Sequence, residues 1–374
     1  MLSTSEILTL ALLEKRKGLK FHRGVDDFTI ETIVSTTIYE RNALLLLTIN
    51  SPIELCNRLK SGYTVIENAL NSPDYKEYSI AKKKGGVREI FAPNRELKGI
   101  QKRLNYLLQA FYLVVKPSEV HGFVINPIYL GKACNIVENA KIHVKRKAVL
   151  NIDLKDFFPN IRASRVLDLF SSQLFGFNRE IATALTLLTT YKGRLPIGGP
   201  TSPVISNFIC LEMDRDLKVF CEENKLYYSR YADDLTFSAD YPITNDEILD
   251  LIGIINKHNF RINEKKLRMK ASNRKQTVTG LTVNDKVNVD RKMLKNTRAM
   301  LHDLCVNGIE EATKRHFHLK HSVDDEDTTK FLYRLDGYIN FIGQVRGKKD
   351  AVYLGMKRQL GLGIRAVERA KEEF

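Results

Sequence analysis

The stretch LYYSRYADDLTFSAD, residues 226–240, holds two adjacent carboxylates, Asp233 and Asp234, between two strand-like runs. This pattern predicts a tight hairpin whose turn brings both side chains into one small volume. Two carboxylates that close together repel each other unless a cation neutralises them. The stretch therefore predicts a divalent-metal site at the turn of a hairpin.

A third carboxylate is expected from another strand, because two Mg²⁺ ions that clamp a phosphoryl transfer each need several hard oxygen ligands. The apolar segment AVLNIDLKDFFPNI, residues 148–161, supplies Asp153. We expect Asp153, Asp233 and Asp234 to bind two Mg²⁺ ions. The alternative is that these carboxylates only pair with Lys or Arg on a surface.

The composition indicates a folded, basic protein. The chain has 374 residues, of which 43% are hydrophobic, and a formal net charge of +15. That charge attracts phosphate backbones, so nucleic acid is the first partner to consider; the alternative is a basic protein without a polyanionic partner. Five scattered cysteines without a Cys-x-x-Cys pair argue against a zinc knuckle or a disulfide framework and suit a reducing cytoplasm. The N-terminal residues do not resemble a secretory signal, and no apolar run is long enough to span a membrane.

The pattern along the chain predicts an α+β protein. Residues 1–75 favour helices, which carry no recognisable chemistry. The KKKGG segment, residues 82–86, predicts a basic hairpin that either closes over a triphosphate or is only a solvated turn. The elements predicted after it are a basic amphipathic helix from residue 94, strands 148–153, 226–231, 234–238 and 260–263, a helix 202–223, a hairpin 276–290 turning at 284–285, and basic helices from residue 291.

The order of these segments resembles the palm of reverse transcriptases over roughly residues 76–345. Three segments also resemble motifs of that family: LPIGGPTSPVISN (195–207), YADD (231–234) and INEKK (262–266). The first of them has Ile197 in place of the usual Gln. The resemblance implies a right-hand polymerase with fingers, a palm built on an antiparallel sheet, and a helical thumb. Its expected divisions are an N-terminal helical region (1–75), fingers and palm (76–290), and a basic, RNA-binding thumb (291–374).

Two signatures narrow the resemblance to retron-type enzymes. The segment NAKIH contains Asn139 and His143 in the retron Asn-Ala-x-x-His pattern, and Val278-Thr279-Gly280 matches the retron Val-Thr-Gly pattern. The resemblance implies that these five residues contact RNA. From the residues alone, a buried, hydrogen-bonded histidine is the default interpretation of His143, and a simple strand with a glycine bulge is the alternative for 278–280.

The resemblance also implies roles around the incoming nucleotide. The residues expected to bind it are Arg88, Lys84, Phe158 and Lys266. Phe158 would act as a steric gate against a 2′-hydroxyl, with core packing as the competing interpretation, since Phe157 and Phe158 would point opposite ways on a strand. Lys266 would serve as proton donor or charge partner for the leaving pyrophosphate, with Lys265 as an alternative.

Together, these motifs resemble those of a retron reverse transcriptase, which implies an enzyme that copies part of a structured noncoding RNA into single-stranded DNA. Priming from a 2′-hydroxyl of that RNA would give a branched RNA–DNA molecule, msDNA, and the resemblance also implies a role in antiphage defence. The expected partners are the cognate noncoding RNA, its reverse-transcribed DNA, dNTPs and a separate effector protein, with no membrane. The alternatives are another bacterial defence or group II intron-like reverse transcriptase with a different primer, and a catalytically silent RNA-binding scaffold.

Overall fold

The computed structural model describes residues 38–82, 85–125 and 133–372. These residues form two compact units. The first comprises the described residues up to Asn135 together with Leu150–Phe237 and Ile243–Arg268; the second comprises Ile136–Val149, Ser238–Pro242 and the described residues from Met269 onward. The helices expected within residues 1–37 lie outside the described residues.

The first unit begins with helices around the long amphipathic helix α6. Its first elements are α3 (Ile38–Leu47), α4 (Pro52–Arg58), α5 (Tyr63–Asn71), the hairpin β1 (Tyr75–Ala81) and β2 (Val87–Pro93), and α6 (Arg95–Val115). Helix α6 starts where predicted, because the Asn94 side chain accepts a hydrogen bond from the backbone N–H of Leu97. Its apolar face is buried against α3 and α11, which fixes the helix beneath the rest of the unit.

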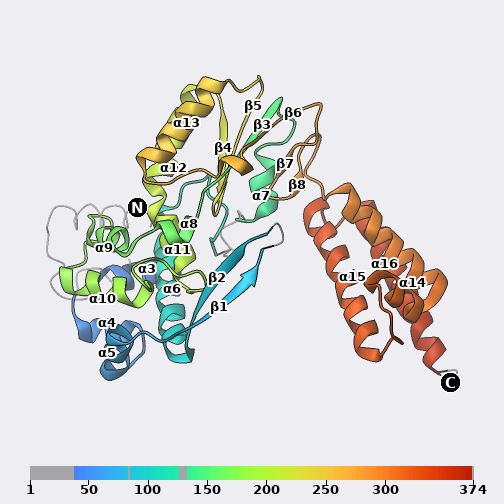
Figure 1. Ribbon diagram of the computed structural model, residues 1–374, viewed down its shortest axis with the longest axis horizontal. Helices are drawn as coiled ribbons and strands as arrows, with labels where there is room; N and C mark the ends of the chain where they lie inside the picture. The colour runs from blue at the N-terminus through green and yellow to red at the C-terminus, as the bar shows by residue number, and fades with distance from the viewer. Residues whose placement is uncertain (1–37, 83–84, 126–132, 373–374) are drawn as a thin grey trace. The chain divides into compact units, whose positions relative to one another are not determined.

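A four-stranded sheet carries the acidic motifs. Its strands are β3 (Ala148–Asp153), β4 (Tyr227–Tyr231), β5 (Asp234–Ala239) and β6 (Arg268–Ala271), in the order β4-β5-β3-β6 (Figure 1). Strands β4 and β5 are antiparallel because only two residues connect them. The central strands β3 and β5 are mostly buried, as their apolar sequences predict.

Helices surround this sheet. They are α8 (Phe157–Asn160), α9 (Ala163–Ser171), α10 (Arg179–Thr189), α11 (Ser202–Ile209), α12 (Leu211–Glu223), α13 (Asn245–Lys257) and the short 3-10 helix η3 (Glu264–Lys266). Helix α12 packs against β4 and α13 (Figure 1). The single helix predicted over 202–223 is two helices that meet at Cys210, whose ψ of −6° departs from a helical value.

The structure differs from the sequence prediction at further places. Residues 260–263 form no strand, and only Ile262 makes an isolated bridge, to Leu154. Strand β6 was missed because all of its residues are exposed and show no apolar alternation. The later hairpin contains a turn that the sequence did not predict, at residues 279–280 between β7 (Thr277–Val278) and β8 (Leu281–Thr282), where both turn residues have positive φ. The predicted turn at 284–285 is also present, because Thr282 and Asn288 pair antiparallel on either side of it.

The second unit is built around three long helices. They are α14 (Arg291–Phe317), α15 (Asp325–Arg346) and α16 (Ala351–Glu372), joined in the same unit by α7 (Ile136–Lys141), β7 and β8. The three long helices pack on one another (Figure 1). Helix α14 is broken at Gly308, where φ is 78°. Among the described residues, no helix is long and apolar enough to cross a membrane.

Candidate active site

The turn between β4 and β5 carries two of the predicted carboxylates. Ala232 and Asp233 join the strands, and Ala232 adopts a left-handed φ of 59°, which is uncommon for a residue with a side chain. Asp233 is half-buried, and Asp234, the first residue of β5, lies at the surface. The predicted hairpin is therefore formed, with both acidic residues at one end of the sheet.

The third carboxylate, Asp153, lies beside that turn. Asp153 is the last residue of β3, which neighbours β5 in the sheet. The backbone N–H of the next residue, Leu154, donates to the carbonyl of Asp233 at 3.0 Å. This backbone bond connects the end of β3 to the acidic turn, so the three predicted carboxylates come from adjacent strand ends.

Lys266 contacts the same site. From η3, its Nζ donates to both carboxylate oxygens of Asp153, at 2.8 and 3.0 Å. Asn263 precedes η3, and its backbone N–H donates to the carbonyl of Asp153 at 2.7 Å. Of the two lysines that the sequence leaves open, Lys266 is thus the one bonded to a predicted metal ligand.

The carboxylates influence one another electrostatically. Burial of the carboxyl group raises the pKa of Asp233, and the nearby charge of Asp153 adds to the increase, although Lys266 and Arg88 oppose it. Asp234 is exposed as a whole residue, yet desolvation of its carboxyl and the charges of Asp233 and Asp153 raise its pKa to about 6. A positive charge bound at this site would therefore favour the ionised form of these two carboxyl groups.

The side chains fit a divalent cation chemically, although they are not arranged as a finished metal site. Within the described ranges, no group of three or more His, Cys, Asp or Glu side chains is placed to hold a metal ion. Carboxylate oxygens are the ligands that Mg²⁺ prefers, and the Lys266 ammonium already places one cation on Asp153. A metal ion here would relieve the repulsion among the carboxylates and compete with Lys266 for Asp153.

A segment that the sequence did not connect with the turn packs directly against it. The N–H of Arg230 donates to the carbonyl of Glu119 at 3.0 Å, and the N–H of His121 donates to the carbonyl of Arg230 at 2.9 Å. Residue 122 follows as a glycine, and a Cβ there would lie 2.3 Å from the backbone nitrogen of Ala232. Only glycine allows so close an approach. Its place in His-Gly-Phe was the sequence signal for this contact.

The predicted nucleotide-binding residues are only partly described. Arg88 is exposed on β2, and its charge lowers the pKa of Asp233, which places it within electrostatic reach of the acidic turn. Lys84 lies outside the described residues. The N–H of Phe91, also on β2, donates to the carbonyl of Ile197 at 2.8 Å, so the basic hairpin is attached to the 195–199 loop.

Phe158 does not lie on a strand. Phe157 and Phe158 belong to the helical turn α8, so the expectation that they point opposite ways along a strand is wrong. The reason is Asp156, whose left-handed φ of 47° ends the extended chain after β3. Phe157 is buried, and its ring lies 5.7 Å from that of Phe260, whereas Phe158 is half-buried. This leaves Phe158 as the more accessible ring of the pair.

The residues of the two retron signatures lie within the second unit, and three of them are buried. Asn139 is 1% exposed, and His143 and Val278 are 0% exposed. His143 Nδ1 and Ser238 Oγ are hydrogen-bonded at 2.7 Å. A side chain without exposed surface does not touch RNA directly, so direct contact is not available to these three residues in this structure. Thr279 and Gly280 form the β7–β8 turn, where Gly280 is exposed.

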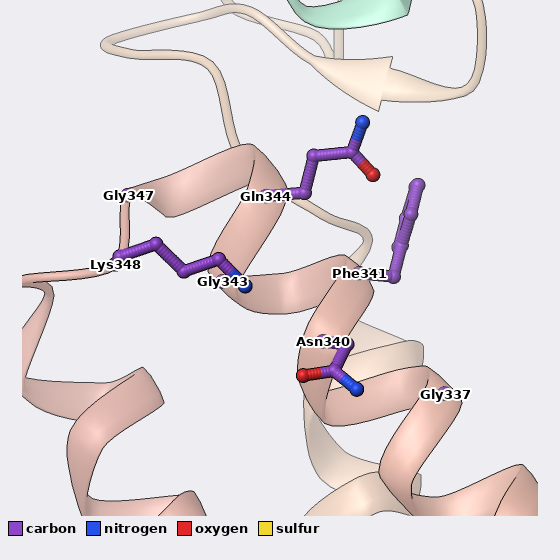
Figure 2. A pocket seen from close by; sticks show the side chains of 7 residues that line it. All are labelled: Gly337, Asn340, Phe341, Gly343, Gln344, Gly347 and Lys348. Carbon is purple, nitrogen blue, oxygen red and sulfur yellow. The ribbon is translucent and has the colours of Figure 1, made fainter.

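Helix α15 of the second unit borders a cavity of about 630 Å³ (Figure 2). Its lining residues are Gly337, Asn340, Phe341, Gly343, Gln344, Gly347 and Lys348. Phe341 and Gln344 project from the same side of the helix, as residues three apart do (Figure 2). The lining thus combines small, amide and basic residues with one aromatic ring, and the exposed Tyr333 lies earlier on the same helix.

Comparison with known proteins decides the family. The family model described as reverse transcriptase (RNA-dependent DNA polymerase) matches residues 80–289, more than half of the chain and the span that holds all three carboxylates. The chain belongs to the reverse transcriptase family. Its α+β fold class, with the right-hand polymerase architecture of that family, is therefore confirmed.

Curated relatives identify the branch of the reverse transcriptase family. The retron Mx65 reverse transcriptase of Myxococcus xanthus is 34% identical over 261 residues, covering 65% of this chain and 58% of the relative. The retron Ec86 reverse transcriptase of Escherichia coli is 35% identical over 236 residues, covering 62% of this chain and 70% of the relative. The resemblance to retron-type reverse transcriptases is confirmed.

Solved structures add a distant likeness. The telomerase from Candida albicans, in complex with a TWJ fragment of telomeric RNA, aligns with a TM-score of 0.45 at 11% identity, covering 78% of this chain and 63% of that one. The telomerase from Candida tropicalis, with the same kind of fragment, gives a TM-score of 0.40 at 13% identity, covering 78% and 61%.

Proposed function

We propose that this member of the reverse transcriptase family copies part of a structured noncoding RNA into single-stranded DNA. In this proposal synthesis starts from a 2′-hydroxyl of the RNA and gives a branched RNA–DNA molecule, msDNA. The observation that carries it is the meeting of Asp153, Asp233 and Lys266 at the ends of adjacent palm strands, in a chain of this family. The retron relatives support the finer assignment.

The proposed chemistry follows from these side chains. Asp153, Asp233 and Asp234 would hold two Mg²⁺ ions, which activate the primer hydroxyl and stabilise the leaving pyrophosphate when bound. Lys266, released from Asp153, would hold a proton or a positive charge close to the pyrophosphate. The raised pKa values of Asp233 and Asp234 support a cationic occupant.

Three further residues would handle the nucleotide. Arg88 and Lys84 on the basic hairpin would neutralise the triphosphate, supported by the electrostatic reach of Arg88 to the acidic turn. Phe158 would exclude a 2′-hydroxyl, supported by its accessibility relative to Phe157. In this proposal, all three side chains contact the incoming dNTP.

RNA recognition would use the second unit in two ways. Thr279 and Gly280, at the β7–β8 turn, would approach the RNA backbone directly. Asn139, His143 and Val278 would act from the core by fixing the shape of that turn's surroundings, since Thr279 Oγ1 donates to the carbonyl of Ile136 at the start of α7.

The remaining parts of the proposal concern organisation and context. The chain would comprise an N-terminal helical region (1–75), fingers and palm (76–290), and a thumb (291–374) that binds RNA through its basic helices. A cytoplasmic location suits five cysteines that form no disulfide. A role in antiphage defence with a separate effector protein extends the proposal from the retron relatives.

The test is to express the protein with its native flanking DNA and analyse the copurifying nucleic acid on a denaturing gel, before and after ribonuclease. We expect a discrete DNA that shortens on RNA digestion, responds to a debranching enzyme, and is absent from the Asp233→Asn variant. DNA that never carries RNA would instead indicate a differently primed polymerase. RNA without DNA would indicate a silent RNA-binding scaffold.

A further inference from the structure

A buried arginine lies directly before the acidic turn. Arg230 is 0% exposed, although a basic residue three positions from Asp233 in so basic a chain would be expected to face nucleic acid. Its Nε and Nη2 donate to the two carboxylate oxygens of Asp214 at 2.7 and 2.6 Å. Asp214 is 1% exposed and also accepts a bond from the Tyr228 hydroxyl at 2.7 Å. The guanidinium is thus fixed by a bidentate, desolvated ion pair.

The remaining arm of the guanidinium points to the turn. Arg230 Nη1 donates to the carbonyl of Ala232 at 3.1 Å and to Oδ1 of Asn207 at 3.0 Å. Ala232 is the turn residue with left-handed backbone, so the bond acts on the peptide that leads into Asp233. A strained turn persists only when its surroundings determine its conformation, and Arg230 is one of those surroundings.

Asn207 closes the arrangement from the other side. Its Nδ2 donates to the carbonyl of Gly122 at 3.0 Å, and Gly122 is the residue whose Cα packs against the backbone of Ala232. Asn207 is 0% exposed. Buried hydrogen bonds therefore run without interruption behind the acidic turn, from Asp214 through Arg230 and Asn207 to Gly122.

We propose that Arg230, held by Asp214 and joined through Asn207 to Gly122, is a positioning residue that sets the place of the Asp233 carboxylate for metal binding and catalysis. It touches neither metal nor nucleotide and acts through the Ala232 carbonyl. This rests on the proposed polymerase function. Loss of partners behind a metal ligand typically lowers metal affinity or activity about 10- to 100-fold.

The test compares Arg230→Lys with Leu185→Ala in the full-length protein. The lysine keeps a charge for Asp214 but loses the fork that reaches Ala232 and Asn207. Leu185 is fully buried on α10, away from the turn network, and serves as a control of lowered stability. Primer extension gives kcat and KM for dNTP, and Mn²⁺ titration followed by electron paramagnetic resonance gives metal affinity without turnover.

We expect Arg230→Lys to lower kcat and Mn²⁺ affinity about 10- to 100-fold, with KM for dNTP changed less than about threefold. Leu185→Ala should lower the melting temperature, but kcat and Mn²⁺ affinity should stay unchanged at temperatures below melting. Equal kinetics and equal Mn²⁺ affinity in the two variants would overturn the positioning role. Wild-type protein without polymerase activity would overturn the proposed function instead.

Asn207→Ala keeps the test decisive where Arg230→Lys does not fold. This variant leaves the Arg230–Asp214 ion pair intact and removes the bonds of Asn207 to Arg230 Nη1 and to the carbonyl of Gly122. We expect a smaller loss in the same direction, about tenfold in kcat and Mn²⁺ affinity. Wild-type values for Asn207→Ala would show that these bonds do not position the turn.

Discussion

Two short hairpin turns in this protein each begin with a residue in left-handed backbone but have different surroundings. The β4–β5 turn has Ala232 at φ 59°, and the β7–β8 turn has Thr279 at φ 46° followed by Gly280 at φ 84°. The carbonyl of Ala232 accepts a bond from the Arg230 guanidinium, and a Cβ at Gly122 would lie 2.3 Å from the Ala232 nitrogen. At Gly280, a Cβ would meet nothing within 4 Å.

The difference in surroundings indicates that the two turns serve different roles. A turn enclosed by packed backbone and buried hydrogen bonds holds its side chains in one place, as metal ligands require. A turn with open space in front of it leaves room for the backbone of another molecule to approach. The first suits chemistry at Asp233, and the second suits recognition at Gly280.

The largest expected effect comes from the charge at the enclosed turn. Asp233→Asn should lower primer-extension activity by about 10³-fold, because it removes a charged oxygen ligand from the site of transition-state stabilisation. Primer extension with Mg²⁺ measures this directly. A near-native rate would mean that Asp233 binds no catalytic metal. Circular dichroism and melting should stay close to wild type, since the residue is only half-buried.

The second largest expected effect tests whether the close packing around the β4–β5 turn matters for catalysis. Gly122→Ala introduces a Cβ 2.3 Å from the nitrogen of Ala232, so the turn must move. A displacement of about 1 Å at a catalytic group costs about 100-fold in rate. Steady-state primer extension at saturating Mg²⁺ measures the loss. Normal activity would show that the turn tolerates displacement and that the contrast between the two turns has no catalytic meaning.

A smaller effect is expected from pH. The raised pKa of Asp234, about 6, means that its ionisation costs the metal-free protein stability as pH rises from the ordinary 3.8 through about 6. Metal binding requires the ionised form, so Mg²⁺ should compensate above that range. We expect Mg²⁺ to raise the melting temperature at pH 8 relative to EDTA, and to have little effect well below pH 6. A Mg²⁺ effect that is independent of pH would contradict this coupling.

The smallest effect is expected at the open turn. Gly280→Ala should cost only about 1–2 kcal/mol of stability, the penalty for a side chain in left-handed backbone, because no atom obstructs the added methyl. Extension of a generic primer–template should be unchanged, while copying of the cognate RNA should fall if the turn approaches it. Thermal melting and paired assays on the two templates measure this. A loss on both templates would place Gly280 in the catalytic machinery.

Local pattern was sufficient for much of the fold and for the acidic ligands. Strand β3, the β4–β5 hairpin and the start of α6 lie where apolar periodicity and the capping residue predict them. Asp153, Asp233 and Asp234 lie at adjacent strand ends because Asp153 ends β3, Asp234 begins β5 and Asp233 precedes Asp234 in the turn. Strand β6 escaped prediction because an exposed strand has no periodicity to detect.

The sequence by itself determined the acidic residues that are proposed to bind metal, the α+β class and the family resemblance, because these depend on residue types in short, ordered segments. Only the tertiary structure decided which basic and polar residues face inward. Arg230 and His143 are buried against partners that are 16 and 95 positions away in the chain. Contacts of that kind leave no local period in the sequence, since burial of a charge is favourable only once its distant partner is in place.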